Sequence, residues 1–183
     1  MLVKRRWAAE LLHLWFHRLR PVDWFAVNER VDTELRRRFS RELAMLSVRP
    51  AREFLSDPQT ALAAVLLFDQ LPRNLFRGTP RAFATDSLAR EITLGAMERG
   101  FDAALTRRER QFLAMPLMHS EDVADQRASV RYFARLGPGF GWEFARTHHS
   151  VVARFGRFPH RNAVLGRKST PAEERAVEAG FRW

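Results

Sequence analysis

The chain has 183 residues, of which 46% are hydrophobic and 28% are charged, a composition typical of a folded globular protein and not of a disordered one. It contains no cysteine, which excludes disulfide scaffolds, thiol nucleophiles, cysteine zinc sites and iron–sulfur clusters. Its formal net charge of +10 comes from 29 arginines and only two lysines, set against 21 acidic residues.

The positive charge is concentrated at the two ends of the chain. The excess of basic over acidic residues is five in residues 1–50, one in residues 51–118 and four in residues 119–183. Basic clusters are typical of nucleic-acid binding, but an arginine-rich composition and solvated helix faces give the same pattern, so nucleic acid is a disfavoured partner. The longest uncharged apolar run is too short for a membrane span and the N-terminus shows no secretion signal, so we expect a cytoplasmic protein without membrane insertion.

Apolar residues recur at spacings of three and four along almost the whole sequence, which predicts helices joined by short turns. The predicted helices cover residues 7–19, 32–49, 58–68, 86–100, 106–115, 120–136, 142–155 and 171–180. Residues 61–68 are apolar on every face, so this segment is the expected central helix of the fold. Because no run alternates long enough for a strand and no linker divides the chain, we predict one all-α domain over residues 1–183.

Several helix ends carry recognisable signals. Asp57 and Thr170 each precede a proline at the first helical position, which is typical of an N-cap. Asp32 and Ser120 are also expected to be N-caps, and Pro116 is expected to end the helix before it.

A first polar segment, residues 69–78, follows the central apolar helix. An acid at the C-terminal end of a helix faces the negative end of the helix dipole, so Asp69 needs a cationic partner. Arg73 and Arg77 are the nearest cations, and Asn74 lies between them. The segment is interpreted either as a ligand-binding element or as a structural ion pair that holds a turn.

A second polar segment, residues 116–122, contains His119 next to Glu121 and Asp122. The acids also suit the first turn of a helix, where they complement its dipole, so they are explained without any function. His119 beside carboxylates is a candidate general base or metal ligand. It has no second histidine at helical spacing, so no metal site is predicted.

A third polar segment, residues 155–167, repeats the proline, arginine and asparagine pattern of the first segment. Its candidate residues are Arg157, His160, Arg161 and Asn162. The similarity predicts two loops whose arginines converge. We expect Asp69 to be buried and within salt-bridge range of an arginine from the second or third segment.

The motifs LLFDQLPRNLFRG (residues 66–78), PLMHSED (116–122) and FGRFPHRN (155–162) resemble those of the bacterial family called domain of unknown function 924. The resemblance extends over nearly the whole chain. It implies a tetratricopeptide-like all-α fold, with helical hairpins forming a short right-handed superhelix. It implies no activity, cofactor or catalytic residue. His13, Phe54 and Phe68 depart from the family pattern, as substitutions expected in the core.

Two functions from different classes remain open. The first is a helical module, without cofactor or metal, that binds a protein partner or a small anionic ligand in a groove. The second is an enzyme on a phosphorylated or carboxylated small molecule, in which a histidine moves a proton, an acid orients it and arginines clamp the anion. The residues for these roles are His119 or His160, Glu121 or Asp122, and the arginines 73, 77, 157 and 161.

Overall fold

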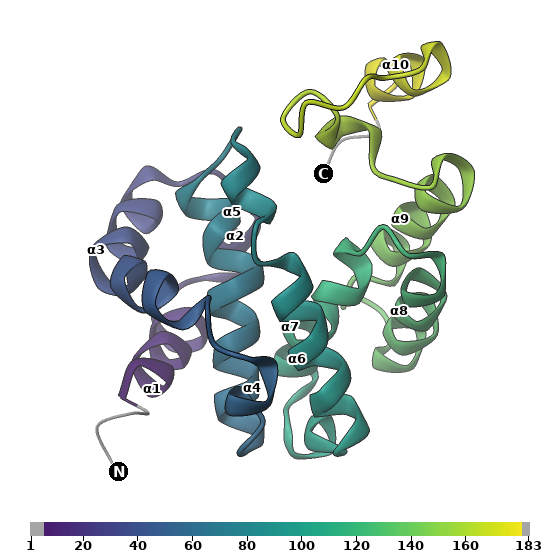
Figure 1. Cartoon of the computed structure of the whole chain (residues 1–183). Helices are drawn as coiled ribbons and strands as arrows, with labels where there is room; N and C mark the ends of the chain where they lie inside the picture. Colours follow the sequence, from purple (N-terminus) through teal and green to yellow (C-terminus); the bar gives the residue numbers. More distant parts are fainter. Residues whose placement is uncertain (1–5, 181–183) are drawn as a thin grey trace.

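The computed structural model describes residues 6–180, and this part of the chain contains helices and no strand, which confirms the all-α prediction (Figure 1). The α-helices in chain order are α1 (Arg6–His13), α2 (Pro21–Phe25), α3 (Glu29–Leu46), α4 (Pro58–Val65), α5 (Leu71–Leu75), α6 (Asp86–Glu98), α7 (Arg107–His119), α8 (Val123–Leu136), α9 (Trp142–Phe155) and α10 (Pro171–Glu178). Residues 1–5, where we expect no secretion signal, lie outside the described residues.

The central helix is the segment that the apolar run predicted. All side chains of residues 61–68 are fully buried, and α4 contacts α1, α6 and α7. Asp57 caps α4 by accepting a hydrogen bond from the backbone N–H of Thr60 at 2.9 Å, as expected. In Figure 1, α4 lies between α1 and α3 on one side and α6 and α7 on the other.

The helical path does not end with the apolar run. A π-helical turn, η4 (Leu66–Gln70), joins α4 to α5 without a break, so the polar residues of the first segment lie on a continuous helical stretch. The expectation that Asp69 stands at the negative end of a helix is therefore wrong. Asp69 lies inside the π-helical turn, a feature that often marks functional sites.

Helices that follow one another in the sequence pack together in the second half of the fold. Helix α6 contacts α7, α7 contacts α8, and α8 contacts α9. A small apolar cluster of Val151, Val152 and Phe158 lies apart from the main core and anchors the chain after α9. The following residues return towards the middle of the molecule before α10 begins (Figure 1). This return brings the third polar segment close to the first.

Three predicted helix boundaries are wrong. The N-cap of α3 is Asn28, whose side chain accepts from two backbone N–H groups, whereas Asp32 lies buried within the helix. The N-cap of α8 is Asp122 and not Ser120. Helix α7 continues through Pro116 to His119, because a proline removes only one backbone hydrogen bond and the neighbouring side chains pack into the core.

Other boundaries agree with the sequence. Thr170 and Glu173 form the predicted capping box of α10. The short helix α2 was not predicted. Within residues 6–180, no helix combines the length and the apolar character that a membrane span requires. The superhelical arrangement of helical hairpins remains a prediction from the family resemblance.

Candidate functional site

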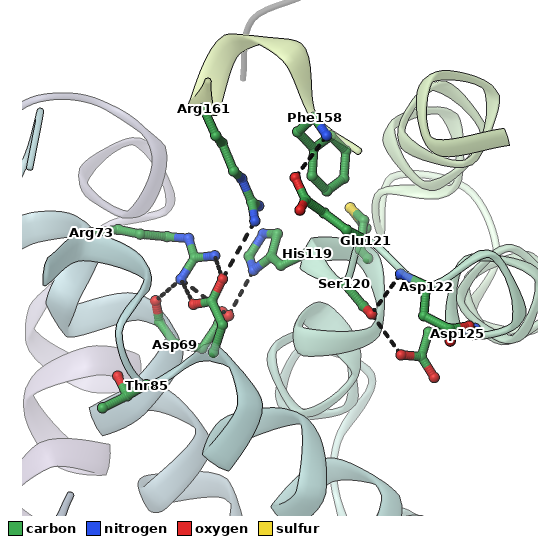
Figure 2. A network of polar contacts seen from close by, with 12 residues as sticks. Asp69, Arg73, Thr85, His119, Ser120, Glu121, Asp122, Asp125, Phe158 and Arg161 are labelled. Atoms are coloured by element: carbon green, nitrogen blue, oxygen red, sulfur yellow. Dashed lines mark hydrogen bonds and ion pairs between the residues drawn. The ribbon is translucent and has the colours of Figure 1, made fainter. Parts of the chain in front are cut away.

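The three polar segments meet at one place between the central helix and the returning C-terminal chain. Figure 2 shows Asp69 and Arg73 from the first segment, His119 from the second and Arg161 from the third around a common centre. The repeated proline, arginine and asparagine pattern predicted that the arginines of the first and third segments converge.

Asp69 is the most deeply buried acid of the cluster, with no exposed surface. Its Oδ1 lies 2.7 Å from Nδ1 of His119 and 3.3 Å from Nη1 of Arg73, and Gln70 donates a hydrogen bond to Oδ2. Burial opposes ionisation, but the positive charge of Arg73 and the hydrogen bonds from His119 and Gln70 outweigh it and hold the pKa of Asp69 below its usual range. Its burial was predicted correctly, but its arginine comes from its own segment and not from the second or third.

Arg73 joins the central helix to the start of α6. Its Nη1 and Nη2 donate to the two carboxylate oxygens of Asp86 at 2.8 and 2.9 Å, and Nη1 also donates to the backbone carbonyl of Asp69. This bidentate geometry is specific to a guanidinium group. Asp86, the first residue of α6, also complements the helix dipole there.

Arg161 enters the cluster from the third segment, and its ion pairing is weaker than that of Arg73. The residue is 6% exposed, and its nearest ion-pair contact is Nη1 to Oδ2 of Asp86 at 3.5 Å. Its Nε is buried without a hydrogen-bond partner among the described residues. The guanidinium carbon lies 4.7 and 4.4 Å from the ring centroids of Phe83 and Phe158. Burial and the nearby charge of Arg73 lower the pKa of Arg161 to about 10.

A pocket of about 400 Å³, here called the Arg161 pocket, opens beside this arginine. It lies between the start of α6, the end of α7 and the returning C-terminal chain. Its lining residues are Pro80, Phe83, Ala84, Asp86, Ser87, Arg90, Pro116, His119, Ser120, Glu121, Arg161 and Leu165. The pocket therefore draws on all three regions that the cluster connects.

The acids of the second segment, Glu121 and Asp122, make structural hydrogen bonds and do not contact His119. Glu121 accepts the backbone N–H of Phe158 at 2.8 Å and a bidentate pair from Arg167 at 2.7 and 2.9 Å. Asp122 accepts the N–H groups that begin α8. The carboxylate at His119 is Asp69, so the expected role of Glu121 or Asp122 as its orienting acid is wrong.

Two residues of the first segment face away from the pocket. Asn74 donates to Asp32 at 2.7 Å, and Arg77 donates to both oxygens of the same carboxylate at 3.1 Å. These contacts tie α5 and the residues just after it to Asp32 on the buried face of α3. Asn74 and Arg77, predicted to bind ligand, are thus engaged in a structural contact.

Two residues of the third segment are also engaged outside the pocket. Arg157 donates to Glu173 at 2.6 and 2.9 Å and so joins the chain after α9 to the start of α10. The side-chain amide of Asn162 donates to Ser169 at 3.1 Å, while its buried Oδ1 has no hydrogen-bond partner among the described residues. Neither residue lines the Arg161 pocket.

Two more histidines lie near the cluster. The ring of His148 is 6.3 Å from that of His119, and the ring of His160 is 5.7 Å from that of Phe158. Burial lowers the pKa of His148 to about 3 and that of His160 to about 4, with nearby positive charges acting in the same direction. Burial also lowers the pKa of His119, despite the attraction of Asp69. All three imidazoles are therefore neutral near pH 7.

The role of Asp86 was missed by sequence analysis. It was predicted only to begin a helix, yet it is the carboxylate at which Arg73 and Arg161 meet. Phe83, which stacks on Arg161, and Arg90, which pairs with Asp125, were missed as well. The segment AFATD (residues 82–86) contains two of them, Phe83 and Asp86.

A larger hollow of about 870 Å³ lies elsewhere, between residues 13–23 and the N-terminal half of α3. Its charged residues include the pairs Arg20 with Asp23 and Arg38 with Glu34. None of the predicted site residues lines it. Within residues 6–180, no group of three or more histidine or acidic side chains is placed to hold a metal ion.

Comparison with known proteins gives a consistent assignment. Residues 11–180 match the family described as bacterial protein of unknown function, DUF924. The solved structure of ATU0120, a protein of unknown function from Agrobacterium tumefaciens, is similar with a TM-score of 0.89 and 37% sequence identity. That match covers 94% of this chain and 97% of the other. No curated protein matches the chain. The chain belongs to the DUF924 family.

Proposed function

We propose that the protein, as a single cytoplasmic domain, binds a small anionic ligand, a carboxylate or a phosphate, in the Arg161 pocket. The volume of about 400 Å³ falls within the range usual for small-molecule sites, which favours a small ligand over a protein partner. The apolar side chains of Pro80, Phe83 and Leu165 lie beside a few polar groups, the usual composition of such a site.

The observation that carries the proposal is the weak pairing of Arg161. The other charged residues that line the pocket each have a close partner: Asp86 has Arg73, Arg90 has Asp125, and Glu121 has Arg167. Arg161 has only the contact at 3.5 Å and makes no side-chain hydrogen bond among the described residues.

The Nε–H group of Arg161 is buried without a partner, which is costly, because burial removes this group from water and nothing replaces the lost hydrogen bond. An anion in the pocket would supply one. A guanidinium group offers two parallel N–H donors, which match the two oxygens of a carboxylate or a phosphate. The guanidinium of Arg161 lies against the rings of Phe83 and Phe158, which restrict its movement, so little side-chain entropy is lost on binding.

The test is a titration of the protein with sodium acetate and with inorganic phosphate at constant ionic strength, followed by the NMR signals of the arginine Nε–H groups. We expect one Nε–H signal to shift with saturation, and we expect this signal to be missing in Arg161→Met. Arg154→Met is the matched control, since it removes the same charge from an exposed position of the same region. Unshifted signals with both anions, or equal binding by Arg161→Met and the wild type, would contradict the proposal.

A further inference from the structure

The second ring nitrogen of His119 is a hydrogen-bond acceptor. Nδ1 lies 2.7 Å from Oδ1 of Asp69, and an ionised carboxylate only accepts hydrogen bonds, so the ring proton is on Nδ1. The imidazole is neutral near pH 7 because burial lowers its pKa. A neutral imidazole protonated on Nδ1 has a lone pair on Nε2.

This acceptor belongs to the Arg161 pocket. His119 lines the pocket together with Arg161. Figure 2 shows the ring of His119 between Asp69 and Arg161, so that the edge opposite Asp69 faces the guanidinium side of the cluster. Among residues 6–180, no hydrogen bond is made to Nε2 of His119. The pocket thus places a free acceptor beside a weakly paired cation.

Resting on the proposed function, we propose that the ligand is a small 2-hydroxy acid, whose carboxylate pairs with Arg161 and whose hydroxyl group donates to Nε2 of His119. Both groups of such an acid are on adjacent carbons, so they reach two side chains that lie next to each other. The apolar side chains of Phe83 and Leu165 then contact the substituent on the hydroxyl-bearing carbon. Asp69 is a positioning residue, since it sets the position of the ring proton without touching the ligand.

The test compares lactate with propionate, which differ only in the hydroxyl group, by calorimetric titration of the wild-type protein at pH 7.5. We expect lactate to bind about 2- to 10-fold more tightly, the range for one net hydrogen bond. In His119→Leu, which removes the acceptor, we expect lactate to bind no better than propionate, while propionate keeps its wild-type affinity. The control Arg154→Met keeps the wild-type preference.

The outcomes separate the two proposals. If both acids bind with equal affinity to the wild-type protein, the 2-hydroxy acid assignment is wrong and the anion site stands. If neither acid binds, and acetate and phosphate also fail, the anion site itself is wrong. If phosphate binds and neither acid does, the site takes phosphates and the 2-hydroxy acid assignment fails.

A second measurement needs no variant that alters the buried cluster. NMR of the wild-type protein labelled with ¹⁵N-histidine reports which ring nitrogen carries the proton. We expect the Nδ1–H form for His119, with the Nε2 signal moving when lactate is added and not when propionate is added. An Nε2–H form, or a charged ring at pH 7.5, would leave no acceptor in the pocket and would overturn the assignment.

Discussion

Replacement of Arg161 by methionine distinguishes a ligand-binding arginine from a structural one. A structural ion pair stabilises the fold, so its removal lowers stability. A binding residue that is buried without adequate partners costs stability in the absence of its ligand. Arg161 is 6% exposed and has its nearest charge partner at 3.5 Å, so we expect it to cost stability in the absence of a ligand.

The size of the stability change in Arg161→Met follows from the contacts of the guanidinium group. The pKa of Arg161 falls from 12.5 to about 10 in the folded protein. At about 1.4 kcal/mol for each pH unit, the folded state destabilises the charged form by roughly 3 kcal/mol. The cation–π contacts with Phe83 and Phe158 offset this destabilisation by about 0.5–2 kcal/mol for each ring. A methionine keeps part of the interaction with the rings through contacts of its sulfur. The net expectation is a gain of about 1 kcal/mol for Arg161→Met.

The assays are urea unfolding, which gives the free energy, and thermal unfolding, which gives the Tm, both followed by far-ultraviolet circular dichroism at pH 7.5 without added carboxylate or phosphate. A gain of about 1 kcal/mol raises the Tm of a chain of this length by about 2–4 °C. Arg154→Met, at an exposed position, is expected to change stability by less than about 0.5 kcal/mol. A loss of about 3 kcal/mol or more in Arg161→Met, the size expected for a broken buried ion pair, would refute the reasoning.

Three further predictions test the surroundings of the pocket. Asp69→Asn should lower the free energy of unfolding by about 3–5 kcal/mol in urea unfolding, because it leaves the buried Arg73 short of an anion and the Nδ1–H group of His119 without its carboxylate acceptor; a loss below about 1 kcal/mol would contradict this. Glu121→Ala should speed hydrogen exchange at the Phe158 amide, whose acceptor it removes, and unchanged exchange would show that other contacts hold the third segment. His148 has a pKa of about 3 in the folded protein, so the unfolded chain binds its proton first and stability falls as the pH decreases below 6.5. Between pH 6.5 and pH 4, the free energy of unfolding falls by about 3 kcal/mol because of His148, and this part of the loss should be absent in His148→Gln. Stability of the variant with the same pH dependence as the wild type would disprove this contribution.

The fold was predictable because helical periodicity is a local property of the sequence. The run of residues 61–68 has no polar face, and a helix of this kind is stable only when other elements surround it. The N-caps at Asp57 and Thr170 were predicted for the same reason, since a cap is formed within one turn. Helix boundaries that depend on tertiary packing were not predicted, as the continuation of α7 through Pro116 shows.

The candidate site was predicted only in part. Asp69, Arg73, His119 and Arg161 were chosen because charged and titratable residues stood in three unusual segments, and the structure brings these four together. Arg77 and Arg157 stand in the same motifs, yet they pair with Asp32 and Glu173 outside the pocket. Nothing local in the sequence distinguishes Arg73 and Arg161 from Arg77 and Arg157, because the carboxylate partners that these arginines have outside their own segments lie 13 or more positions away in the sequence.

The positive charge of the sequence also shows the difference between what the sequence determines and what the tertiary structure decides. Composition determines a chain with 29 arginines, and periodicity determines that it forms helices. Only the tertiary structure decides that Arg73 is matched by Asp86 while Arg161 remains weakly paired beside a pocket, since this depends on distances between segments far apart in sequence. The total charge follows from a count of residues, whereas the charge available to a ligand depends on burial and pairing, which arise only when the segments pack together.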